Sequence, residues 1–280
     1  MRILVIGGDT RMDCTARKLS ELYETERLSG VGDNAVNGEF DVIVLPLPLT
    51  KNGKDIFSPM SAEPVPFEVI EKFAGENTLV LAGGETPLLT QICAKRKIRL
   101  ENYFAREALT LKNAALTAEA ACAMLSQSTD GAILNSSALI TGYGRISRYL
   151  AARLKANGCR VTVAARREEQ RAAAELDGFE AVSIEEMPEE LCKFDYISNT
   201  VPHTLFSEEM FSKMKAECVF MELATLPEQP TRSFAEMQGI KIKYIYASGL
   251  PGKYSPKTAG EFIAEEVVEI LKTTGKFSRS

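Results

Sequence analysis

The sequence predicts an α/β protein of two domains, each with a mainly parallel sheet, and three observations support this fold class. Short β-branched and apolar runs alternate with amphipathic helical stretches along the whole chain. In the first part of the chain these runs end in glycine or proline, which begin turns. Residues 107–127 lack Gly and Pro and are rich in Ala, Leu and Glu, so we expect a helix that links the domains.

The composition is typical of a globular protein and argues against nucleic-acid and membrane partners. With 280 residues, of which 45% are hydrophobic, the chain is long enough to bury two cores. A net charge of -5 and the lack of a basic run argue against a nucleic-acid surface. The apolar run at 42–49 is far shorter than the ~20 residues that span a bilayer, so we expect a cytoplasmic protein without a membrane partner.

The cysteines and the histidine content argue against a metal centre. The six cysteines lie far apart in the sequence without a C-x-x-C pair, so we expect reduced thiols. The chain has a single histidine, His203, and so offers few of the ligands that zinc prefers. We therefore predict no metal.

The alternation of apolar and helical runs sets the expected elements. Residues 1–106 form a Rossmann-like substrate domain with strands at 2–8, 40–49 and 77–84 and helices after Arg11, Val65 and Pro87. After the linker helix, residues 128–255 form a Rossmann domain that binds NADP, with strands at 137–144, 160–166, 194–202, 218–224 and 242–248. Residues 256–280 contain a C-terminal helix from Pro256 to about Lys272, which can return to the N-terminal domain.

A glycine pair between a predicted strand and a predicted helix indicates a dinucleotide site. In "SALITGYGRISRYLAARL" (137–154), Gly142 allows a tight turn and Gly144 lets the backbone reach a pyrophosphate, whereas Ser147 replaces the third glycine of the fingerprint. An ordinary strand–helix turn is the alternative interpretation. The predicted pyrophosphate contacts are Gly142, Tyr143, Gly144, Arg145 and Ile146.

The residues after the second strand of this domain favour NADP over NAD. An acid at this place would bind the ribose 2′-hydroxyl, but "VTVAARREE" has Arg166 and Arg167 there, after Ala165. A guanidinium can pair with a 2′-phosphate through two hydrogen bonds. The following Glu168 and Glu169 keep open the interpretation that both arginines are solvated surface charges.

Two further strand ends are expected to border the nicotinamide, because ligands of open sheets lie outside the carboxyl ends of strands. They are "NTVP" (199–202) and "ELAT" (222–225), and the predicted contacts are Thr200, Val201, Pro202 and Leu223. His203 lies just beyond the first segment, either as an acid or base or as a surface residue.

The segment "ASGLPGKYSPKTAGE" (247–261) predicts an anion site. Pro256 suits the first position of a helix, whose free amides and the two lysines Lys253 and Lys257 can hold a carboxylate or a phosphate. A capped turn with solvated lysines is the alternative. In the first domain the strand-end loops at 7–11, 46–50 and 83–87 are expected to face the inter-domain cleft, with Arg11 as a carboxylate clamp.

Six segments, in this order, resemble the family of bacterial dipicolinate synthase A subunits. They are "IGGDTR", "FDVIVLPLP", "NAALTAEAA", "LITGYGRISRYLAARLKANGCRVTVAAR", "DYISNTVP" and "GLPGKYSPKTAG", which together extend over nearly the whole chain. The TAE and LPGK-x-x-PKTAG elements are the most distinctive. Ser147, His203 and the acidic "GGETP" loop (83–87) depart from the family pattern.

The resemblance implies an NADP-linked oxidoreductase of sporulation that works with a second subunit of the synthase, a flavoprotein. Its substrate would be a cyclic dicarboxylate from a branch of the lysine pathway, dihydrodipicolinate or hydroxytetrahydrodipicolinate, and its product dipicolinate. Thr117 and Glu119 on the linker helix, with Lys253, are then the predicted catalytic residues, although a polar residue on a long helix often just faces solvent. The predicted substrate-binding residues are Asp9, Arg11, Pro46, Thr86, Lys257 and Thr258.

Two other functions stay open at the level of sequence. A two-domain NADP dehydrogenase of the shikimate type, or of the alanine or 2-hydroxy acid type, would use Lys51 as its acid–base group. The lack of a His–carboxylate pair weakens the hydroxy-acid version. A non-catalytic NADP-binding partner of another protein is the other alternative, and a homo-oligomer is also open.

Overall fold

The computed structural model describes residues 1–30, 36–225 and 242–274, which fall into two compact units. Unit 1 comprises Met1–Asn113 and Pro251–Ser280, and unit 2 comprises Ala114–Leu250. The chain enters unit 2 within helix α4 (Glu107–Gln127), whose bounds agree with the predicted linker helix, and re-enters unit 1 in α10 (Leu250–Tyr254). Within the described residues, no helix is both long enough and apolar enough to cross a membrane.

Unit 1 is built on a parallel sheet with the strand order β2-β1-β3-β6-β7. These strands are β1 (Arg2–Ile6), β2 (Glu24–Leu28), β3 (Phe40–Val44), β6 (Ala74–Ala82) and β7 (Arg99–Asn102), and a small antiparallel pair joins β4 (Asp55–Ile56) to β5 (Val65–Pro66). The helices are α1 (Thr10–Ser20), α2 (Ile70–Phe73), α3 (Pro87–Arg96) and the short η1 (Phe67–Val69) and η2 (Tyr103–Ala105). The edge strands β2 and β7 were not predicted, because ETERL and RLEN carry mainly polar residues.

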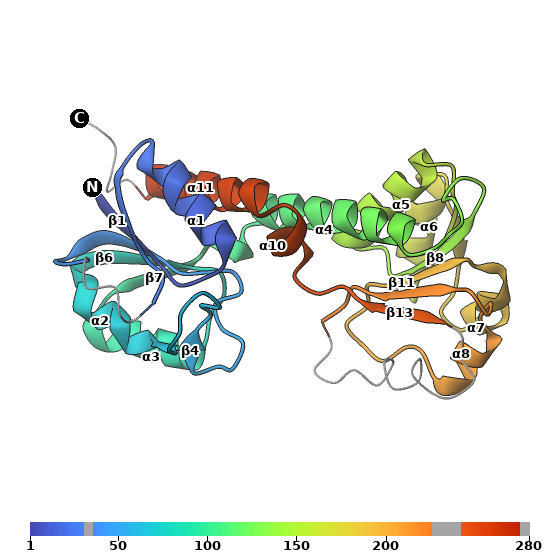
Figure 1. The fold of residues 1–280 in the computed structure, drawn as a ribbon, viewed down its shortest axis with the longest axis horizontal. Helices are drawn as coiled ribbons and strands as arrows, with labels where there is room; N and C mark the ends of the chain where they lie inside the picture. Colours follow the sequence, from blue (N-terminus) through green and yellow to red (C-terminus); the bar gives the residue numbers. More distant parts are fainter. Residues whose placement is uncertain (31–35, 226–241, 275–280) are drawn as a thin grey trace. The chain divides into compact units, whose positions relative to one another are not determined.

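Successive residues of the strands in unit 1 face two different helical layers. Ile3 and Val5 of β1 pack in one cluster with α1 and α11 (Pro256–Thr273), whereas Leu4 and Ile6 pack in another cluster with α2 and α3. This two-sided burial is typical of a parallel sheet covered on both faces. Figure 1 shows α1 and α11 side by side over the sheet.

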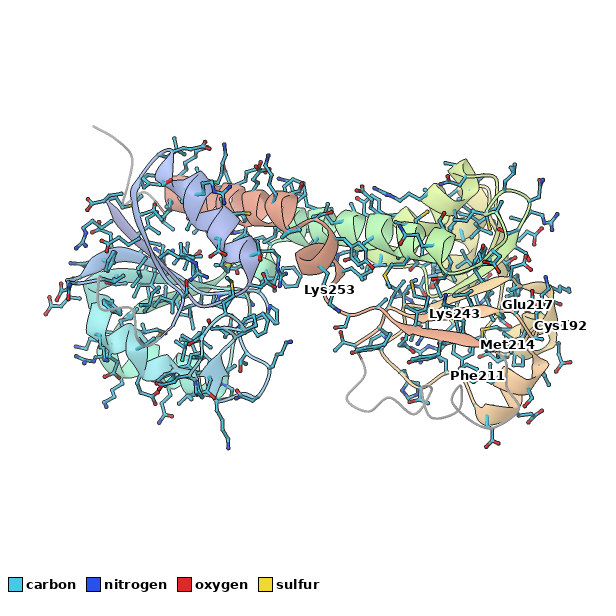
Figure 2. The ribbon with its side chains drawn as sticks, in the orientation of Figure 1. Cys192, Phe211, Met214, Glu217, Lys243 and Lys253 are labelled. Carbon is cyan, nitrogen blue, oxygen red and sulfur yellow. The ribbon has the colours of Figure 1, made fainter. Side chains whose placement is uncertain are left out.

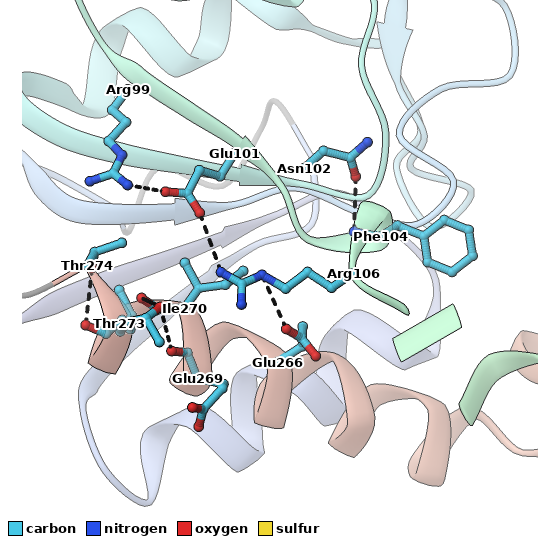
Figure 3. A network of polar contacts seen from close by, with 11 residues as sticks. Arg99, Glu101, Asn102, Phe104, Arg106, Glu266, Glu269, Ile270, Thr273 and Thr274 are labelled. Atoms are coloured by element: carbon cyan, nitrogen blue, oxygen red, sulfur yellow. Dashed lines mark hydrogen bonds and ion pairs between the residues drawn. The ribbon is translucent and has the colours of Figure 1, made fainter. Parts of the chain in front are cut away.

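Helix α11 is fixed to unit 1 by close backbone packing and by ion pairs. A Cβ added to Gly260 would overlap the carbonyl oxygen of Arg11, so α1 and α11 approach closely there. Arg106 lies between Glu101 of β7 and Glu266 of α11, at 4.0 and 3.5 Å, as Figure 3 shows. The prediction that the C-terminal helix returns to the N-terminal domain is confirmed.

Unit 2 is built on a second parallel sheet with the strand order β10-β9-β8-β11-β12-β13. Its strands are β8 (Ser137–Thr141), β9 (Arg160–Ala164), β10 (Glu180–Val182), β11 (Tyr196–Asn199), β12 (Val219–Glu222) and β13 (Lys243–Tyr246). Its described helices are α5 (Arg145–Ala156), α6 (Glu168–Leu176), α7 (Met187–Glu190), η3 (Leu191–Lys193) and α8 (Glu208–Lys213). The strand order reverses between β8 and β11, which is where ligands bind in such sheets, and the Rossmann-like prediction is confirmed.

Candidate functional site

The loop after β8 has the backbone geometry of a phosphate-binding turn. Gly142 has φ +77°, and an added Cβ would lie 3.1 Å from Cγ2 of Val201 and 3.3 Å from Oγ1 of Thr200. Only glycine takes this conformation readily. An added Cβ at Gly144, the N-cap of α5, has no heavy atom within 4 Å, so open space lies beside the backbone where a pyrophosphate would approach.

Ser147 does more than replace a packing glycine. Its side chain is fully buried, and its Oγ accepts a hydrogen bond of 2.9 Å from the Gly144 amide. The same Oγ lies 3.2 Å from Oγ1 of Thr200. The serine therefore connects the glycine loop to the end of β11, a link that the sequence motif alone does not reveal.

Tyr143 holds the loop against the body of unit 2 with its side chain. The tyrosine is 5% exposed, and its hydroxyl donates a hydrogen bond of 2.6 Å to Oδ2 of Asp177. Burial and this hydrogen bond both raise the pKa of Tyr143. Its ring packs edge-on against Phe179, so a predicted cofactor contact at this residue would come from its backbone. Ile146 packs partly buried against the core and Arg145 is exposed.

The two arginines expected near a 2′-phosphate are exposed at the carboxyl end of β9. Arg166 and Arg167 follow the buried Ala165. Arg171 of α6 donates from Nη1 to the carbonyl oxygens of Ala165 and Arg166, both at 2.9 Å. This third arginine fixes the backbone that carries the other two, and no motif in the sequence indicated it.

A buried polar row ends three neighbouring strands of unit 2. Thr141, Asn199 and Glu222 are in register at the ends of β8, β11 and β12, and each is 0% exposed. The Thr141 hydroxyl donates to Asn199 Oδ1 at 2.6 Å, and Asn199 Nδ2 donates to the Glu222 carboxylate at 2.9 and 3.1 Å. Sequence reasoning missed this row, although each of the three apolar runs ends in a polar residue. The predicted contact Leu223 follows directly and is buried.

Asp9 and Arg11 of unit 1 bind each other. Asp9 caps α1, and Arg11 donates from Nε and Nη2 to its two carboxylate oxygens at 2.9 and 2.8 Å. Burial opposes ionisation of Asp9, but the hydrogen bonds and charge of Arg11 outweigh it and lower the pKa of Asp9. An added Cβ at Gly252 would lie 2.8 Å from Nε of Arg11, so α10 covers this pair. The Arg11 guanidinium, which was predicted to bind a substrate carboxylate, is thus already hydrogen-bonded to the carboxylate of Asp9.

The structure brings several of the predicted substrate segments together at the strand ends of unit 1. Buried Pro46 lies beside Gly8 and Gly83, since an added Cβ at Gly8 would lie 3.0 Å from Cβ of Pro46, and one at Gly83 would lie 2.5 Å from its carbonyl oxygen. Thr86 is half-buried and uses its side chain to cap α3, accepting from the Leu89 amide at 3.1 Å. Pro46 and Thr86 therefore have structural roles of their own.

The lysines of the predicted anion site are exposed. Lys253 lies on α10, where Figure 2 labels it, and Lys257 lies in the first turn of α11 with Thr258 half-buried beside it. Ser255 occupies the N-cap position of α11, but its side chain makes no capping hydrogen bond. Lys253 directly follows Gly252, the α10 residue that lies against the Asp9–Arg11 pair.

Thr117 and Glu119 point to different sides of α4. Positions two apart on a helix do not share a face. Thr117 is 7% exposed, whereas the Glu119 side chain is 62% exposed and lies 3.4 Å from Arg153 of α5. The structure does not bring Thr117 and Glu119, two of the three predicted catalytic residues, to the same side of α4. His203 and Pro202 are exposed beyond β11.

Comparison with known proteins relates the two units to two enzyme families. Residues 2–104 match the N-terminal domain of the dipicolinate synthase A subunit, and residues 111–225 match the D-isomer specific 2-hydroxyacid dehydrogenase, NAD binding domain. The dipicolinate synthase A subunit of Bacillus subtilis is 28% identical, with 97% of this chain and 96% of the relative aligned.

Solved structures extend the similarity to the fold of the whole chain. The structure of the dipicolinate synthase A subunit from Bacillus halodurans has a TM-score of 0.83 at 26% identity, covering 96% of this chain and 97% of that one. The structure of its counterpart from Bacillus subtilis has a TM-score of 0.81 at 25% identity, covering 98% and 96%. Unit 2 is therefore a dinucleotide-binding domain for a nicotinamide cofactor, and the chain is an oxidoreductase with a dehydrogenase-type role.

Proposed function

We propose, because nearly the whole chain is similar to the A subunit of dipicolinate synthase, that this protein oxidises a cyclic dicarboxylate to dipicolinate with NADP. The substrate is dihydrodipicolinate or its hydrated form, hydroxytetrahydrodipicolinate, and the flavoprotein subunit of the synthase is the partner. The observation that carries the proposal is the pairing, in one chain, of the synthase N-terminal domain with a dehydrogenase-type NAD-binding domain.

The residues of unit 2 fit a dinucleotide, and we assign it as NADP. The amides of the loop from Gly142 to Ile146 would hold the pyrophosphate, and the open space at Gly144 admits it. Arg166 and Arg167 would pair with the 2′-phosphate, on backbone fixed by Arg171. When bound, the nicotinamide supplies the hydride acceptor.

The residues of unit 1 fit a dianionic substrate. Lys253, Lys257 and the first-turn amides of α11 offer positive charge and hydrogen-bond donors to carboxylates. Because the Arg11 fork is engaged by Asp9, we assign Arg11 to support α10 and so to orient Lys253, in addition to its charge. Pro46 and Thr86, in strand-end loops, and Thr258, in the first turn of α11, remain proposed substrate contacts.

The proposed reaction depends more on orienting the substrate ring than on strong acid–base catalysis. The hydrated precursor first loses water to give dihydrodipicolinate. The dihydro ring then loses one hydride to the cofactor and one proton to a base, and the ring becomes aromatic, which supplies driving force. Holding both carboxylates orients the reacting carbon. We assign the proton to the Glu119 carboxylate, which is exposed beside Arg153. Thr117 is buried on a different side of α4 and so does not share the ring with Glu119.

A 2-hydroxyacid dehydrogenase is the second candidate, since residues 111–225 match the NAD-binding domain of that family. Such an enzyme needs an acid–base group close to the nicotinamide. The candidates for that group are His203, the only histidine of the chain, and Lys51, which is exposed with its ammonium 4.5 Å from the Phe57 ring centre. Turnover of 2-hydroxy acids with either nicotinamide cofactor would favour this candidate.

The test is to incubate the protein with NADP and the cyclic precursor, with and without the flavoprotein partner, and to follow dipicolinate and NADPH. We expect both products to form together. Replacing Lys253 and Lys257 by alanine should raise KM at least about tenfold, because each loses a charged contact to a carboxylate. Exposed Lys272, at the other end of α11, is the matched control, and Lys272→Ala should leave KM unchanged. Absence of dipicolinate in the presence of a competent flavoprotein would refute the proposal.

A further inference from the structure

The buried polar row Thr141–Asn199–Glu222 has no part in the function proposed so far. Its members end β8, β11 and β12, on both sides of the point where the strand order reverses. Burying polar side chains, and a carboxylate above all, costs free energy that hydrogen bonds only offset. Buried apolar residues, Ile140 and Met221, directly precede Thr141 and Glu222 in their strands. We therefore expect the row to have a function at the carboxyl ends of the strands, which is the edge of the sheet where ligands bind.

The row fixes the Asn199 amide in one orientation. Its Nδ2 donates to both oxygens of Glu222, at 2.9 and 3.1 Å, and its Oδ1 accepts from the Thr141 hydroxyl at 2.6 Å. A flipped amide would bring Oδ1 against the carboxylate oxygens, which are acceptors only when ionised. Glu222 and Thr141 together therefore determine which end of the amide faces which neighbour.

The fixed amide in turn holds the chain that leaves β11. The Val201 amide donates to Asn199 Oδ1 at 3.1 Å, and Asn199 Nδ2 lies 3.3 Å from the Val201 carbonyl oxygen. Thr200, between them, donates to the Thr141 carbonyl at 2.7 Å, and its Oγ1 lies 3.2 Å from Ser147 of the glycine loop. The Asn199 side chain thus holds the backbone at Val201, next to Thr200, whose own hydroxyl contacts the glycine loop at Ser147.

We propose that Asn199 is a positioning residue for the nicotinamide half of the cofactor, with Glu222 and Thr141 orienting its amide. The inference rests on the proposed function, in which Thr200, Val201 and Pro202 border the nicotinamide. Arg166, which is assigned to the 2′-phosphate of the adenosine half, lies on backbone that Arg171 fixes, away from the row. Loss of the row should therefore weaken binding of the whole dinucleotide, but not of its adenosine half.

The test compares two ligands on isosteric variants. Asn199→Asp removes the Nδ2 donor that faces Glu222, and Glu222→Gln replaces one of the two oxygens that accept from this donor with an NH2 group. For both variants we expect the Kd for NADPH to rise at least about tenfold and the Kd for 2′,5′-ADP to stay within about twofold. Hydride transfer at saturating NADP should slow as well, since the ring is misplaced.

A matched control lies at the other end of the same two strands. Asp195 precedes β11 and accepts from the amide and the hydroxyl of Ser137, both at 2.8 Å, at the start of β8. Asp195→Asn disturbs the pairing of β8 with β11 far along the strands from the row, so it should lower thermal stability without changing either Kd.

The outcomes separate this inference from the function on which it rests. Equal loss of affinity for both ligands, or no loss for either, overturns the positioning role. A wild-type protein that binds no NADPH overturns the cofactor assignment itself. If Asn199→Asp does not fold, Glu222→Gln decides, because it keeps the size and shape of the side chain and replaces one acceptor oxygen with an NH2 donor.

Discussion

Gly142 and Gly144 stand two residues apart and act differently. Gly142 has φ +77° and contacts with Thr200 and Val201, so Gly142→Ala should lower the free energy of unfolding by about 1–3 kcal/mol. Gly144→Ala should leave stability nearly unchanged but raise the Kd for NADPH at least about tenfold, because its Cβ enters the open space beside the loop. Urea unfolding and ligand titration measure both effects. Normal NADPH affinity in Gly144→Ala would contradict the assignment of the loop.

Under the proposed function, the exposed arginines after β9 distinguish NADPH from NADH. In the double variant Arg166→Ala, Arg167→Ala, the Kd for NADPH should rise about tenfold or more while the Kd for NADH stays the same, since only NADPH carries the 2′-phosphate. Arg160→Ala, at the exposed start of the same strand, is the control. Equal weakening of both cofactors would show that the arginines do not read the 2′-phosphate.

The Asp9–Arg11 pair makes stability depend on pH in a defined direction. The pKa of Asp9 is lowered in the folded chain because the hydrogen bonds from Arg11 outweigh burial. The carboxylate therefore stabilises the fold above its unfolded pKa of about 4, and this contribution is lost as the pH falls through the lower folded value. Asp9→Asn, which keeps the helix cap, should cost about 1–3 kcal/mol at neutral pH. Urea unfolding should show the difference from wild type shrinking below pH about 4, and a difference constant with pH would contradict this linkage.

At the scale of elements, periodicity and propensity predicted the central strands and the long helices. The run 107–127 became α4 with the same bounds, and the strands at 137–144 and 160–166 became the shorter β8 and β9. The edge strands β2, β7 and β10 were not predicted from the sequence. A strand at the edge of a sheet tolerates polar residues on both faces, as ETERL in β2 shows. The buried polar row was not predicted for another reason. Only the register of the strands shows that Thr141, Asn199 and Glu222 lie side by side, and the sequence alone does not give this register.

The packing of α1 against α11 gives a prediction for two elements far apart in sequence. An added Cβ at Gly260 would overlap the Arg11 carbonyl and lie 2.7 Å from Cβ of Cys14. Alanine favours a helix over glycine by about 1 kcal/mol, but overpacking costs about 1–3 kcal/mol or more. We expect Gly260→Ala to lower the urea midpoint, and Glu265→Ala, exposed on the same helix, to change it little. A stabilised Gly260→Ala protein would contradict the close contact.

At the scale of the whole molecule, the proposed reaction is divided between the two units. Unit 2 has the dehydrogenase-type NAD-binding domain, whose match to known proteins the glycine loop anticipated. The lysines proposed for the substrate belong to unit 1, which matches the N-terminal domain of the synthase family. Sequence motifs predicted the glycine loop and the segment that carries the two lysines. They did not predict that Asp9 binds Arg11 or that Thr117 and Glu119 point to different sides of α4, because both depend on side-chain geometry.

The central claim is that a hydride passes directly from the dicarboxylate ring to NADP. The most direct measurement uses a dihydrodipicolinate labelled with deuterium at the carbon that loses the hydride, and analyses the NADPH formed by mass spectrometry. We predict one deuterium in the nicotinamide ring for each dipicolinate produced. Dipicolinate formed with unlabelled NADPH, or with the label released to water, would contradict the claim.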